Sequence, residues 1–460
     1  MNTLEVAVIG AGYVGLSTAA ALAACGHRVW VVERDPMRLE MLQSGRVPIQ
    51  EPHLKAALFA PSSAVCFTAD LRIAVCASSI VVIAVGTPPT PSHGADLSQL
   101  YAVLEGIAPL LDEQPRVVVV KSTVPVGTHA QASQELRRLA PIASFALVSN
   151  PEFLRQGRAV RDAVFPDRIV VGATQPWAFQ AMKTLYGALL EGQISLTEAL
   201  ELERPVSLPA WLEVSPRSAE LAKYAANAFL AMKISFVNEI ANVCEETGAD
   251  IDEVISVLGS DARIGADFLR AGLGYGGSCF PKDTRALSQI AAKSGYDFQL
   301  LRAVIEVNAA QRYRALDTLE RRLNGVRGKT VTVLGLTFKP DTDDLRESLG
   351  IDLALELAAR GAFVRTHDPV AAQAARGLLP AGIAVSGNLE AMLTGADACV
   401  LVTEWREYLT ADWARLGARM RHALVLDGRN ALEPTVMCAA GFTYLGIGRA
   451  DTRLTRQSRD

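Results

Sequence analysis

The stretch VAVIGAGYVG at residues 6–15 joins a short apolar run to a helical pattern. In a strand, turn and helix of this kind, Gly10 allows the tight turn and Gly12 lets backbone amides approach a pyrophosphate. Gly15 lets the helix pack closely against the strand, and the helix N-terminus faces the phosphates. The stretch therefore predicts a Rossmann-like dinucleotide-binding unit at the start of the chain.

An acidic residue after the second apolar run supports this interpretation. Glu33 follows the run Val29–Val32, close to the spacing at which a carboxylate accepts a hydrogen bond from a ribose 2′-hydroxyl. Because a carboxylate there repels a 2′-phosphate, NAD is favoured over NADP. Arg34 and Arg38 lie beside it and weaken that preference.

Short apolar runs alternate with longer helical patterns on both sides of a helical middle section. Runs that are apolar on both faces are typical of parallel strands covered by helices. The pattern predicts an α/β fold with two Rossmann-like doubly wound domains, residues 1–212 and 326–460, joined by a helical central domain, residues 213–325. The expected strands are Leu4–Ile9, Val29–Val32, Ile80–Val85, Val117–Val120, Ala146–Val148, Thr330–Leu334, Val364–Thr366, Ala398–Val402 and Leu424–Leu426.

Composition and charge exclude several classes of protein. The 460 residues are 50% apolar and 20% charged, the balance of an ordinary globular protein. A net charge of −4 gives no reason to expect a nucleic acid or an anionic membrane as partner. Seven cysteines in so long a chain do not suggest a disulfide scaffold, so we expect a reducing compartment, the cytoplasm.

One uncharged stretch, Val6–Cys25, has the length of a membrane span. Its three glycines and the lack of a preceding Lys or Arg argue against both a span and a secretory signal. We interpret it as a buried strand that leads into a buried helix.

The segment GLGYGGSCFPKD at residues 272–283 carries the strongest chemical signal. Its glycines allow the backbone to lie against a ligand. Pro281 suits the first turn of a helix, which places Cys279 at a helix N-terminus, where the dipole favours a thiolate. Asp283 follows one turn later. A cysteine that only packs is the alternative, and we expect that role for Cys25, Cys66, Cys76, Cys244, Cys399 and Cys438.

Three further polar residues occupy informative positions. Lys223 and Asn227 are four apart in an apolar helical stretch, and Glu152 follows a predicted strand at the end that faces the ligand crevice. A solvated helix face and a surface carboxylate are the alternatives. The six histidines are scattered, so no metal site is expected. With NAD and a thiolate, this set is suited to oxidising an aldehyde through a thiohemiacetal and a thioester.

Nine ordered segments between Val6 and about Gly428 together resemble the UDP-glucose 6-dehydrogenase family, within the wider UDP-glucose/GDP-mannose dehydrogenase family of nucleotide-sugar dehydrogenases. The segments are GAGYVG (10–15), VGTP (85–88), STVPVGT (122–128), NPEFL (150–154), PDRIVVG (166–172), KYAANAFLAMKISFVNE (223–239), DARIGADFL (261–269), GYGGSCFPKD (274–283) and FKPDTDDLRES (338–348).

The resemblance implies a two-step, four-electron oxidation of UDP-glucose at C6, which yields UDP-glucuronate and two NADH. It implies that Cys279 is the nucleophile and Glu152 the general base in thioester hydrolysis, with Lys223 stabilising the negative oxygen. The implied catalytic residues are Cys279, Lys223, Asn227, Asp283, Glu152 and Thr123, the last near the nicotinamide.

The resemblance also implies the binding residues and a homodimer formed through the central helix. The cofactor residues would be Gly10, Gly12, Tyr13, Val14, Gly15, Glu33, Arg38, Thr87, Pro88, Ser122, Thr123, Gln156 and Arg346. The substrate residues would be Glu152, Phe153, Leu154, Lys223, Asn227, Tyr275, Gly276, Phe338, Lys339 and Arg429, with Arg263 reaching the substrate from the partner subunit.

The chain departs from the family pattern in a few places. Gln156 stands where the family usually has Glu, and we expect a shifted pH optimum rather than lost activity. Gln50 and His53 replace a usual Tyr and Gly, and residues 191–212 are interpreted as an extra surface segment. Rival functions are a dehydrogenase of GDP-mannose or of a UDP-N-acetylhexosamine, a two-electron alcohol dehydrogenase, and a non-catalytic nucleotide-sugar sensor.

Overall fold

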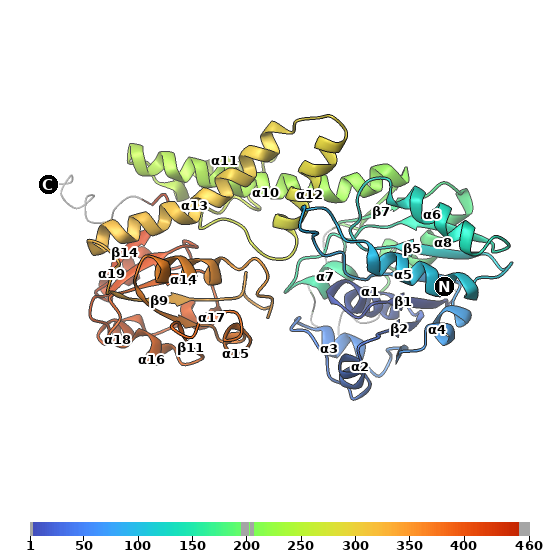
Figure 1. The fold of residues 1–460 in the computed structure, drawn as a ribbon, viewed down its shortest axis with the longest axis horizontal. Coiled ribbons are helices and arrows are strands. Elements are labelled where there is room, and N and C mark those ends of the chain that lie inside the picture. The colour runs from blue at the N-terminus through green and yellow to red at the C-terminus, as the bar shows by residue number, and fades with distance from the viewer. Residues whose placement is uncertain (1–2, 195–201, 203–206, 450–460) are drawn as a thin grey trace. The chain divides into compact units, whose positions relative to one another are not determined.

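The computed structural model describes residues 3–194, 202 and 207–449. The chain forms two compact units, 1–226 and 227–460, each with its own sheet (Figure 1). None of the described helices is long and apolar enough to cross a membrane. The division into three domains at residues 212 and 325 stays a prediction.

The first unit is built on a sheet that has eight strands within the described residues, in the order β3-β2-β1-β4-β5-β6-β7-β8. β1 to β6 are parallel, whereas β7 pairs antiparallel with β6 and parallel with β8. The strand order reverses direction between β1 and β4, which is where doubly wound sheets bind ligands. The strands are β1 (Glu5–Ile9), β2 (Arg28–Val32), β3 (Val65–Thr68), β4 (Ile80–Ile83), β5 (Arg116–Val120), β6 (Phe145–Ser149), β7 (Arg168–Gly172) and β8 (Ala210–Val214).

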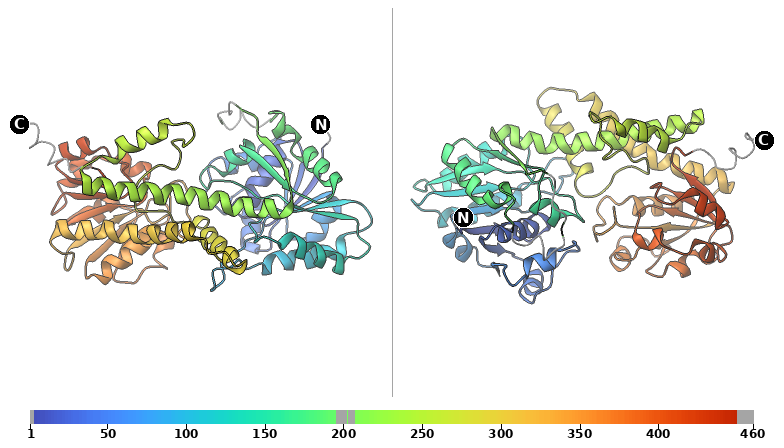
Figure 2. Two further views of the ribbon diagram at one scale, coloured as in Figure 1. Left: turned by 90° about the horizontal axis from the view of Figure 1, so that it is seen from above. Right: turned by 180° about the vertical axis from the view of Figure 1, so that it is seen from behind.

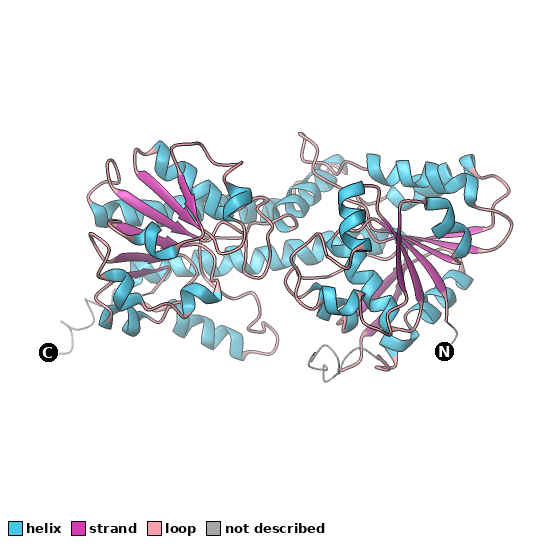
Figure 3. Ribbon diagram, turned by 90° about the horizontal axis from the view of Figure 1, so that it is seen from below, coloured by secondary structure: helices cyan, strands magenta, loops and turns pink. Residues whose placement is uncertain are grey.

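Helices cover both faces of this sheet (Figure 3). The first helix, α1, buries ten of its residues, which explains why its sequence carries no charge. α2 begins where the side chain of Asp35 accepts hydrogen bonds from two backbone amides and Pro36 opens the first turn. The helices are α1 (Tyr13–Ala24), α2 (Pro36–Gln43), α3 (Leu54–Leu58), α4 (Leu71–Ala77), α5 (Ser98–Ile107), α6 (Thr128–Leu139), α7 (Ala159–Val164), α8 (Pro176–Leu185) and α9 (Gly187–Leu190), with a 3-10 turn at Ala108–Leu110.

The second unit contains a parallel sheet in the order β11-β10-β9-β12-β13-β14, again with helices on both faces (Figure 3). Its strands are β9 (Thr330–Leu334), β10 (Phe363–His367), β11 (Ala384–Ser386), β12 (Ala398–Leu401), β13 (Leu424–Asp427) and β14 (Thr443–Gly446). The helices that accompany it are α14 (Leu349–Ala359), α15 (Ala372–Ala375), α16 (Leu389–Leu393), α17 (Arg406–Leu409), α18 (Trp413–Gly417) and α19 (Pro434–Ala439).

Four further helices form the helical section: α10 (Pro216–Thr247), α11 (Ile251–Ser260), α12 (Phe280–Lys293) and α13 (Gln299–Leu323). Within the second unit, α10 and α13 run side by side (Figure 2). Ser235 Oγ donates to Val304 O at 2.9 Å, and the Asn242 amide donates to Gln311 Oε1 at 3.1 Å. These two bonds, one buried and one partly buried, hold the two long helices in one register.

All the predicted strands are present, and the predicted buried strand and helix at Val6–Cys25 are β1 and α1. The strands β3, β7, β8, β11 and β14 were not predicted. Within the segment 191–212, interpreted as an extra surface segment, residues 210–212 begin β8 and pair with β7, where they are exposed or half-buried. Residues 195–201 and 203–206 of that segment lie outside the described residues.

Candidate active site

The three glycines of the opening loop meet different surroundings. A Cβ at Gly15 would lie 1.8 Å from Gly10 O, and a Cβ at Gly10 would lie 2.7 Å from Ala84 O. Gly10 also has a φ of +105°. A Cβ at Gly12, by contrast, would meet no atom within 4 Å. Gly10 and Gly15 are therefore needed for packing, whereas Gly12 faces open space at the N-terminus of α1, the cradle that a pyrophosphate requires.

Glu33 comes directly after β2, beside the same loop. Its carboxylate accepts a hydrogen bond from Asp35 N at 2.9 Å and one from Arg38 Nε at 3.3 Å. Arg38 also donates to Ala11 O at 2.7 Å, so it ties the end of β2 to the glycine loop. An ionised carboxylate has about four acceptor sites, so Glu33 keeps capacity for a ribose hydroxyl.

The loops after β4 and β5 are fastened to each other. Thr87 Oγ1 donates to Thr123 O at 2.8 Å, and Ser122 Oγ donates to Val85 O at 2.7 Å. Both loops lie at the carboxyl ends of neighbouring strands, where the Rossmann ligand binds. The predicted cofactor residues Thr87, Ser122 and Thr123 are thus brought together in the first unit.

Glu220 of α10 supports the same loop at its far end. Its carboxylate accepts hydrogen bonds from Gly127 N at 2.7 Å and His129 N at 2.6 Å. Burial raises the pKa of this carboxyl, while the two backbone donors lower it. Glu220 thereby provides acceptors for amides at the start of α6 that would otherwise have no intrahelical partner.

Glu152 and Lys223 form a buried ion pair in the first unit. Lys223 Nζ lies 3.1 Å from Glu152 Oε1, and Leu154 N donates to Glu152 Oε2 at 2.5 Å. The Phe153 ring has the Lys223 ammonium 5.4 Å and the Arg168 guanidinium 3.9 Å from its centroid. These two predicted catalytic residues are therefore in contact, which excludes the surface-carboxylate alternative for Glu152.

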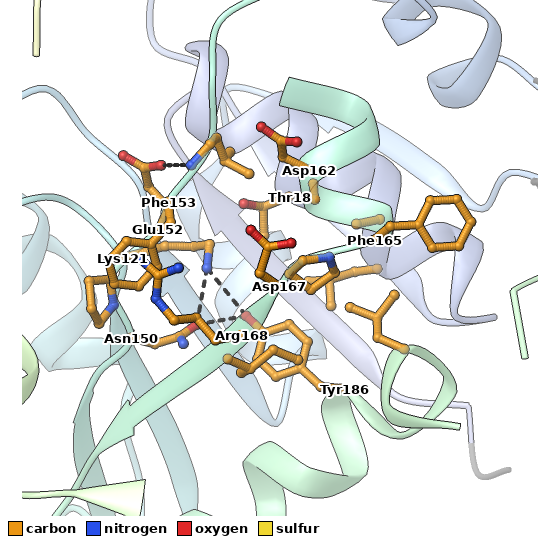
Figure 4. A pocket seen from close by; sticks show the side chains of 18 of the residues that line it. Thr18, Lys121, Asn150, Glu152, Phe153, Asp162, Phe165, Asp167, Arg168 and Tyr186 are labelled. Atoms are coloured by element: carbon orange, nitrogen blue, oxygen red, sulfur yellow. Dashed lines mark hydrogen bonds between the residues drawn. The ribbon is translucent and has the colours of Figure 1, made fainter. Parts of the chain in front are cut away.

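Lys121, which the sequence analysis did not single out, lies next to this pair. It lines a cavity of about 70 Å³ together with Asn150, Glu152 and Tyr186 (Figure 4). Burial lowers the pKa of Lys121 to about 8, although the Glu152 carboxylate raises it. A lysine directly after the apolar strand Arg116–Val120, at the ligand end of the sheet, is the sequence signal that could have identified it.

In the second unit, Cys279 is the N-cap residue of α12, as predicted. Its side chain is exposed, and Ser278 Oγ lies 3.8 Å from its Sγ. The amide of Asp283 donates to Cys279 O at 2.8 Å, which closes the first turn. The positive end of the helix dipole at this position favours a thiolate over a thiol.

Asp283 is buried and is held by two side chains. Asn227 Nδ2 donates to Asp283 Oδ2 at 2.6 Å, and Lys282 Nζ lies 2.5 Å from Asp283 Oδ1. Lys282 was not predicted. Lys223 and Asn227 are four residues apart on α10, one turn of the helix. Both are buried, so the solvated-face alternative for this pair is wrong.

The glycines before Cys279 let bare backbone touch other segments. A Cβ at Gly272 would lie 2.7 Å from Gly428 O, and one at Gly276 would lie 2.3 Å from Glu347 O. At Gly277 it would lie 2.5 Å from the Phe338 ring. Any larger residue would therefore push the loop away from these segments.

Two asparagines that sequence reasoning missed also hold this loop. Asn308 of α13 accepts a hydrogen bond from Tyr275 N at 2.7 Å and donates to Tyr275 O at 3.0 Å. Asn238 of α10 accepts one from Gly272 N at 2.8 Å. An asparagine in a helix is an ordinary residue type, so only the long-range contact reveals this role.

The predicted substrate residues of the second unit are placed differently. Arg429 donates from Nε to Val402 O at 2.6 Å and from Nη1 to Gly274 O at 3.0 Å, so it is joined to the glycine loop. Lys339 Nζ lies 5.4 Å from the centroid of the Phe338 ring. The predicted contacts of these residues with a UDP-sugar stay predictions.

Two other predicted arginines pair with local acids. Arg346 makes two hydrogen bonds with Asp344, at 2.8 and 2.6 Å, and Arg263 pairs with Asp261 at 2.6 Å. The Arg263 side chain is 89% exposed. A cofactor contact for Arg346 and a substrate contact for Arg263 stay predictions.

In the second sheet, the carboxylate that follows β10 is already hydrogen-bonded within its own chain. Asp368 follows β10 at the position that Glu33 has after β2, but its Oδ2 accepts from Leu336 N at 2.8 Å and Thr337 N at 3.1 Å. Trp405 Nε1 lies 3.3 Å from the same oxygen. Because its own chain already occupies this carboxylate, the second unit is not built for a second dinucleotide of the same kind.

Of the remaining cysteines, Cys66 is half-buried, and the other five fall into two groups. Burial raises the pKa of Cys25 to about 12 and also raises the pKa of Cys244 and Cys399, so these are unreactive core residues. Cys76 and Cys438 are exposed, so the expectation that they pack in apolar surroundings is wrong. Among the described residues, no group of three or more His, Cys, Asp or Glu could hold a metal ion.

Three family models match the chain in order. The NAD binding domain of the UDP-glucose/GDP-mannose dehydrogenase family matches residues 4–190, its central domain matches 217–310, and its UDP binding domain matches 332–434. The first match assigns NAD to the unit whose glycine loop and Glu33 have the geometry described above.

Whole-chain relatives agree with these models. The chain is 44% identical to a UDP-glucose 6-dehydrogenase of Pseudomonas aeruginosa, over 97% of this chain and 98% of that protein. It is 40% identical to the UDP-glucose 6-dehydrogenase TuaD of Bacillus subtilis, over 99% of this chain and 95% of that protein. A solved UDP-glucose dehydrogenase from Pyrobaculum islandicum covers 98% of both chains with a TM-score of 0.87 and 38% identity.

The surroundings of the glycines predict that a substitution at Gly15 lowers the stability of the fold, whereas one at Gly12 weakens NAD binding. Gly15→Ala will lower the free energy of unfolding by about 2 kcal/mol, because its Cβ overlaps the Gly10 carbonyl. Gly12→Ala, the matched control, will unfold at the wild-type urea concentration but bind NAD at least about tenfold more weakly. Urea denaturation and calorimetric titration with NAD check both. Equal NAD affinity of Gly12→Ala and wild type would contradict the assignment of the cradle.

Proposed function

Because the chain belongs to the UDP-glucose/GDP-mannose dehydrogenase family, we propose that it oxidises UDP-glucose at C6 to UDP-glucuronate in two NAD-dependent steps. The observation that carries the proposal is Cys279 at the N-cap of α12. A nucleophilic sulfur has no task in a simple alcohol oxidation or in a sensor, but it is needed where an aldehyde must be held and oxidised again.

The chemistry divides into two oxidations and a hydrolysis. Bound NAD⁺ supplies the hydride acceptor for each oxidation, so two NADH leave per sugar. The Cys279 thiolate adds to the C6 aldehyde left by the first oxidation and forms a thiohemiacetal, which the second oxidation converts to a thioester. Water then forms a bond to C6, the C–S bond breaks, and the carboxylate product leaves with the thiol restored.

The buried polar residues supply what these steps require. Lys223 and Asn227 are the donors suited to the C6 oxygen, where negative charge develops in the tetrahedral intermediate. Asp283, fixed by Asn227 and Lys282, is suited to orienting the water. Glu152 is the general base that takes the proton from that water, and its Oε1 lies 3.1 Å from the Lys223 ammonium.

The choice of UDP-glucose over other nucleotide sugars rests on the relatives. The whole-chain relatives at 40–44% identity are named as UDP-glucose 6-dehydrogenases. A solved UDP-D-ManNAc dehydrogenase of Pyrococcus horikoshii is 27% identical, with a TM-score of 0.80 over 97% of this chain. GDP-mannose and UDP-N-acetylhexosamines are therefore the rival substrates.

The predicted homodimer has support in an apolar stripe on α10. Phe229, Phe236 and Val243 are seven residues apart and 58%, 52% and 55% exposed. Residues at this spacing lie along one side of a helix, as in helices that pair with a copy of themselves. We therefore propose that a second copy covers this stripe. The exposed Arg263 side chain fits the prediction that it serves the partner's site.

The cysteine usage fits the proposed cytoplasmic location.

NADH stoichiometry tests the proposed reaction. With limiting UDP-glucose and excess NAD, we expect two NADH per sugar, measured by absorbance and checked by mass spectrometry of the product. GDP-mannose and UDP-N-acetylhexosamines, as controls, will give a kcat/KM at least about a hundredfold lower. One NADH per sugar would contradict the covalent scheme, and a rival sugar that outperforms UDP-glucose would contradict the substrate assignment.

The apolar stripe predicts a dimer that one charge can break. Phe236→Glu will place a carboxylate in the interface and weaken association by at least about a hundredfold, because a desolvated charge lacks a partner there. Sedimentation velocity at micromolar concentrations measures the change. Phe363→Glu, at an exposed phenylalanine on β10, is the matched control and will remain dimeric. A Phe236→Glu protein that sediments as a dimer would contradict the proposal.

A further inference from the structure

Glu347 contacts the chain on both sides of the proposed nucleophile. Before Cys279, the amide of Gly277 donates a hydrogen bond to Glu347 O at 3.3 Å. After Cys279, Arg285 of α12 donates from Nη1 to Glu347 Oε1 at 3.0 Å and from Nη2 to Glu347 Oε2 at 3.3 Å. One residue, 62 positions beyond Arg285, therefore joins the glycine loop to the helix that Cys279 caps.

The backbone of Glu347 has a conformation that its residue type disfavours. Its φ is +50°, in the left-handed region, which a residue with a Cβ adopts only at a cost in free energy. Such conformations persist where surrounding contacts hold them, and they cluster at functional sites. A glycine would adopt the same backbone without that cost. The presence of a glutamate side chain at this position therefore needs an explanation.

The side chain of Glu347 belongs to a group of four charges at one cavity. Arg285, Arg312, Glu347 and Asp352 line a cavity of about 100 Å³ together with Tyr275 of the glycine loop. The guanidinium of Arg312 pairs with the Asp352 carboxylate, as that of Arg285 pairs with Glu347. Because packing is incomplete at a cavity, the two ion pairs supply contacts that apolar side chains do not make there.

The geometry of the Arg285–Glu347 pair distinguishes it from an ordinary surface ion pair. The two side chains are 36% and 46% exposed, and a single pair at such exposure contributes little to stability. Here both guanidinium nitrogens contact the carboxylate, in the planar fork geometry that fixes orientation as well as distance. We therefore expect this pair to hold a geometry without adding much to the free energy of unfolding.

We infer that Glu347 and Arg285 are positioning residues for the nucleophile: their ion pair fastens the glycine loop to α12 and so keeps the Cys279 sulfur at the N-terminus of that helix. The consequence for catalysis rests on the proposed function, in which Cys279 carries the thioester. A thiolate at a helix N-terminus is stabilised by the dipole, so more of the sulfur is in its nucleophilic form. Neither Glu347 nor Arg285 gains or loses a proton in the reaction.

Glu347→Gly removes the side chain, keeps the carbonyl that accepts from Gly277, and suits the positive φ. The protein will therefore unfold at the wild-type urea concentration. Alkylation of Cys279 by iodoacetamide at neutral pH, in which the thiolate displaces iodide, will slow about fivefold, because the sulfur is held less well at the helix terminus. Peptide mass spectrometry measures the rate. The exposed Cys76 of the same molecule is the internal reference and will keep its wild-type rate.

Two changes at Arg285 test the same contact from α12. Arg285→Met removes the charge and keeps most of the length, so it will slow alkylation of Cys279 as Glu347→Gly does. Arg285→Lys keeps a charge that can reach one carboxylate oxygen, so it will restore the rate to within about twofold of wild type. Asn324→Gly is the matched control for the backbone, because Asn324 also has a positive φ, +53°, at the end of α13. This control will leave alkylation of Cys279 unchanged.

Turnover of UDP-glucose connects the position of the sulfur with the reaction. Because the thiolate must attack the C6 aldehyde, kcat will fall together with the alkylation rate in Glu347→Gly and Arg285→Met, by about fivefold in each. Arg285→Lys will recover both rates. If alkylation of Cys279 slows while kcat stays at its wild-type value, the ion pair does not position the sulfur for the reaction and the inference is overturned.

The remaining outcomes separate the inference from the function on which it rests. If Glu347→Gly and Arg285→Met alkylate Cys279 at the wild-type rate, or if Cys76 slows to the same extent, the ion pair has no specific effect on the sulfur and the inference falls. If Glu347→Gly does not fold, the Arg285 variants decide by the same two rates. If Cys279→Ala forms UDP-glucuronate at the wild-type rate, the proposed function fails. If Cys279→Ala is inactive while the ion-pair variants behave as wild type, the proposed function stands and only the inference falls.

Discussion

The close approach of bare backbone around residues 272–277 is the constraint on which the position of the nucleophile depends. Gly272, Gly276 and Gly277 each lie where a single added carbon would collide with Gly428, Glu347 or Phe338. These contacts hold the loop against segments that are distant in sequence and place Cys279 at the N-cap of α12. The helix dipole stabilises a thiolate at this place, so the glycine contacts that position the loop also put the sulfur where it is reactive.

Glu152 and Lys223, candidate catalytic residues of the first unit, are buried charged side chains, whereas the nucleophile of the second unit lies at a helix N-terminus. Glu152, Lys223 and Lys121 are all buried, and each alone would be costly to ionise. Glu152 and Lys223 form an ion pair at 3.1 Å, and the Glu152 carboxylate favours the charged form of Lys121. The surrounding hydrogen bonds of Asn150 fix the strand ends, so these charges need not also hold the fold together.

Sequence patterns predict local structure well and long-range contacts poorly. The glycine loop, the apolar strands and the N-cap position of Cys279 were predictable, because turn geometry, burial and proline preference act over a few residues. β7 and β8 were missed, and the antiparallel pairing of β7 with β6 is one that no local pattern specifies.

The same limit applies to the site. The ion pair of Lys223 with Glu152 joins residues 71 positions apart, and the two bonds of Asn308 to Tyr275 span 33. Lys282 and Lys121 are ordinary lysines until their surroundings are known. The family resemblance supplied the roles of Cys279, Lys223 and Glu152, whereas the structure alone showed which side chains hold them in place.

The account depends most directly on a covalent bond between one sulfur and the half-oxidised sugar. The measurement that tests it is the rate of UDP-glucuronate formation by Cys279→Ala beside Cys76→Ala, which alters another exposed thiol. The account predicts a loss of at least about a thousandfold for Cys279→Ala and a rate within about twofold of wild type for Cys76→Ala. Wild-type acid formation without the Cys279 sulfur would contradict it.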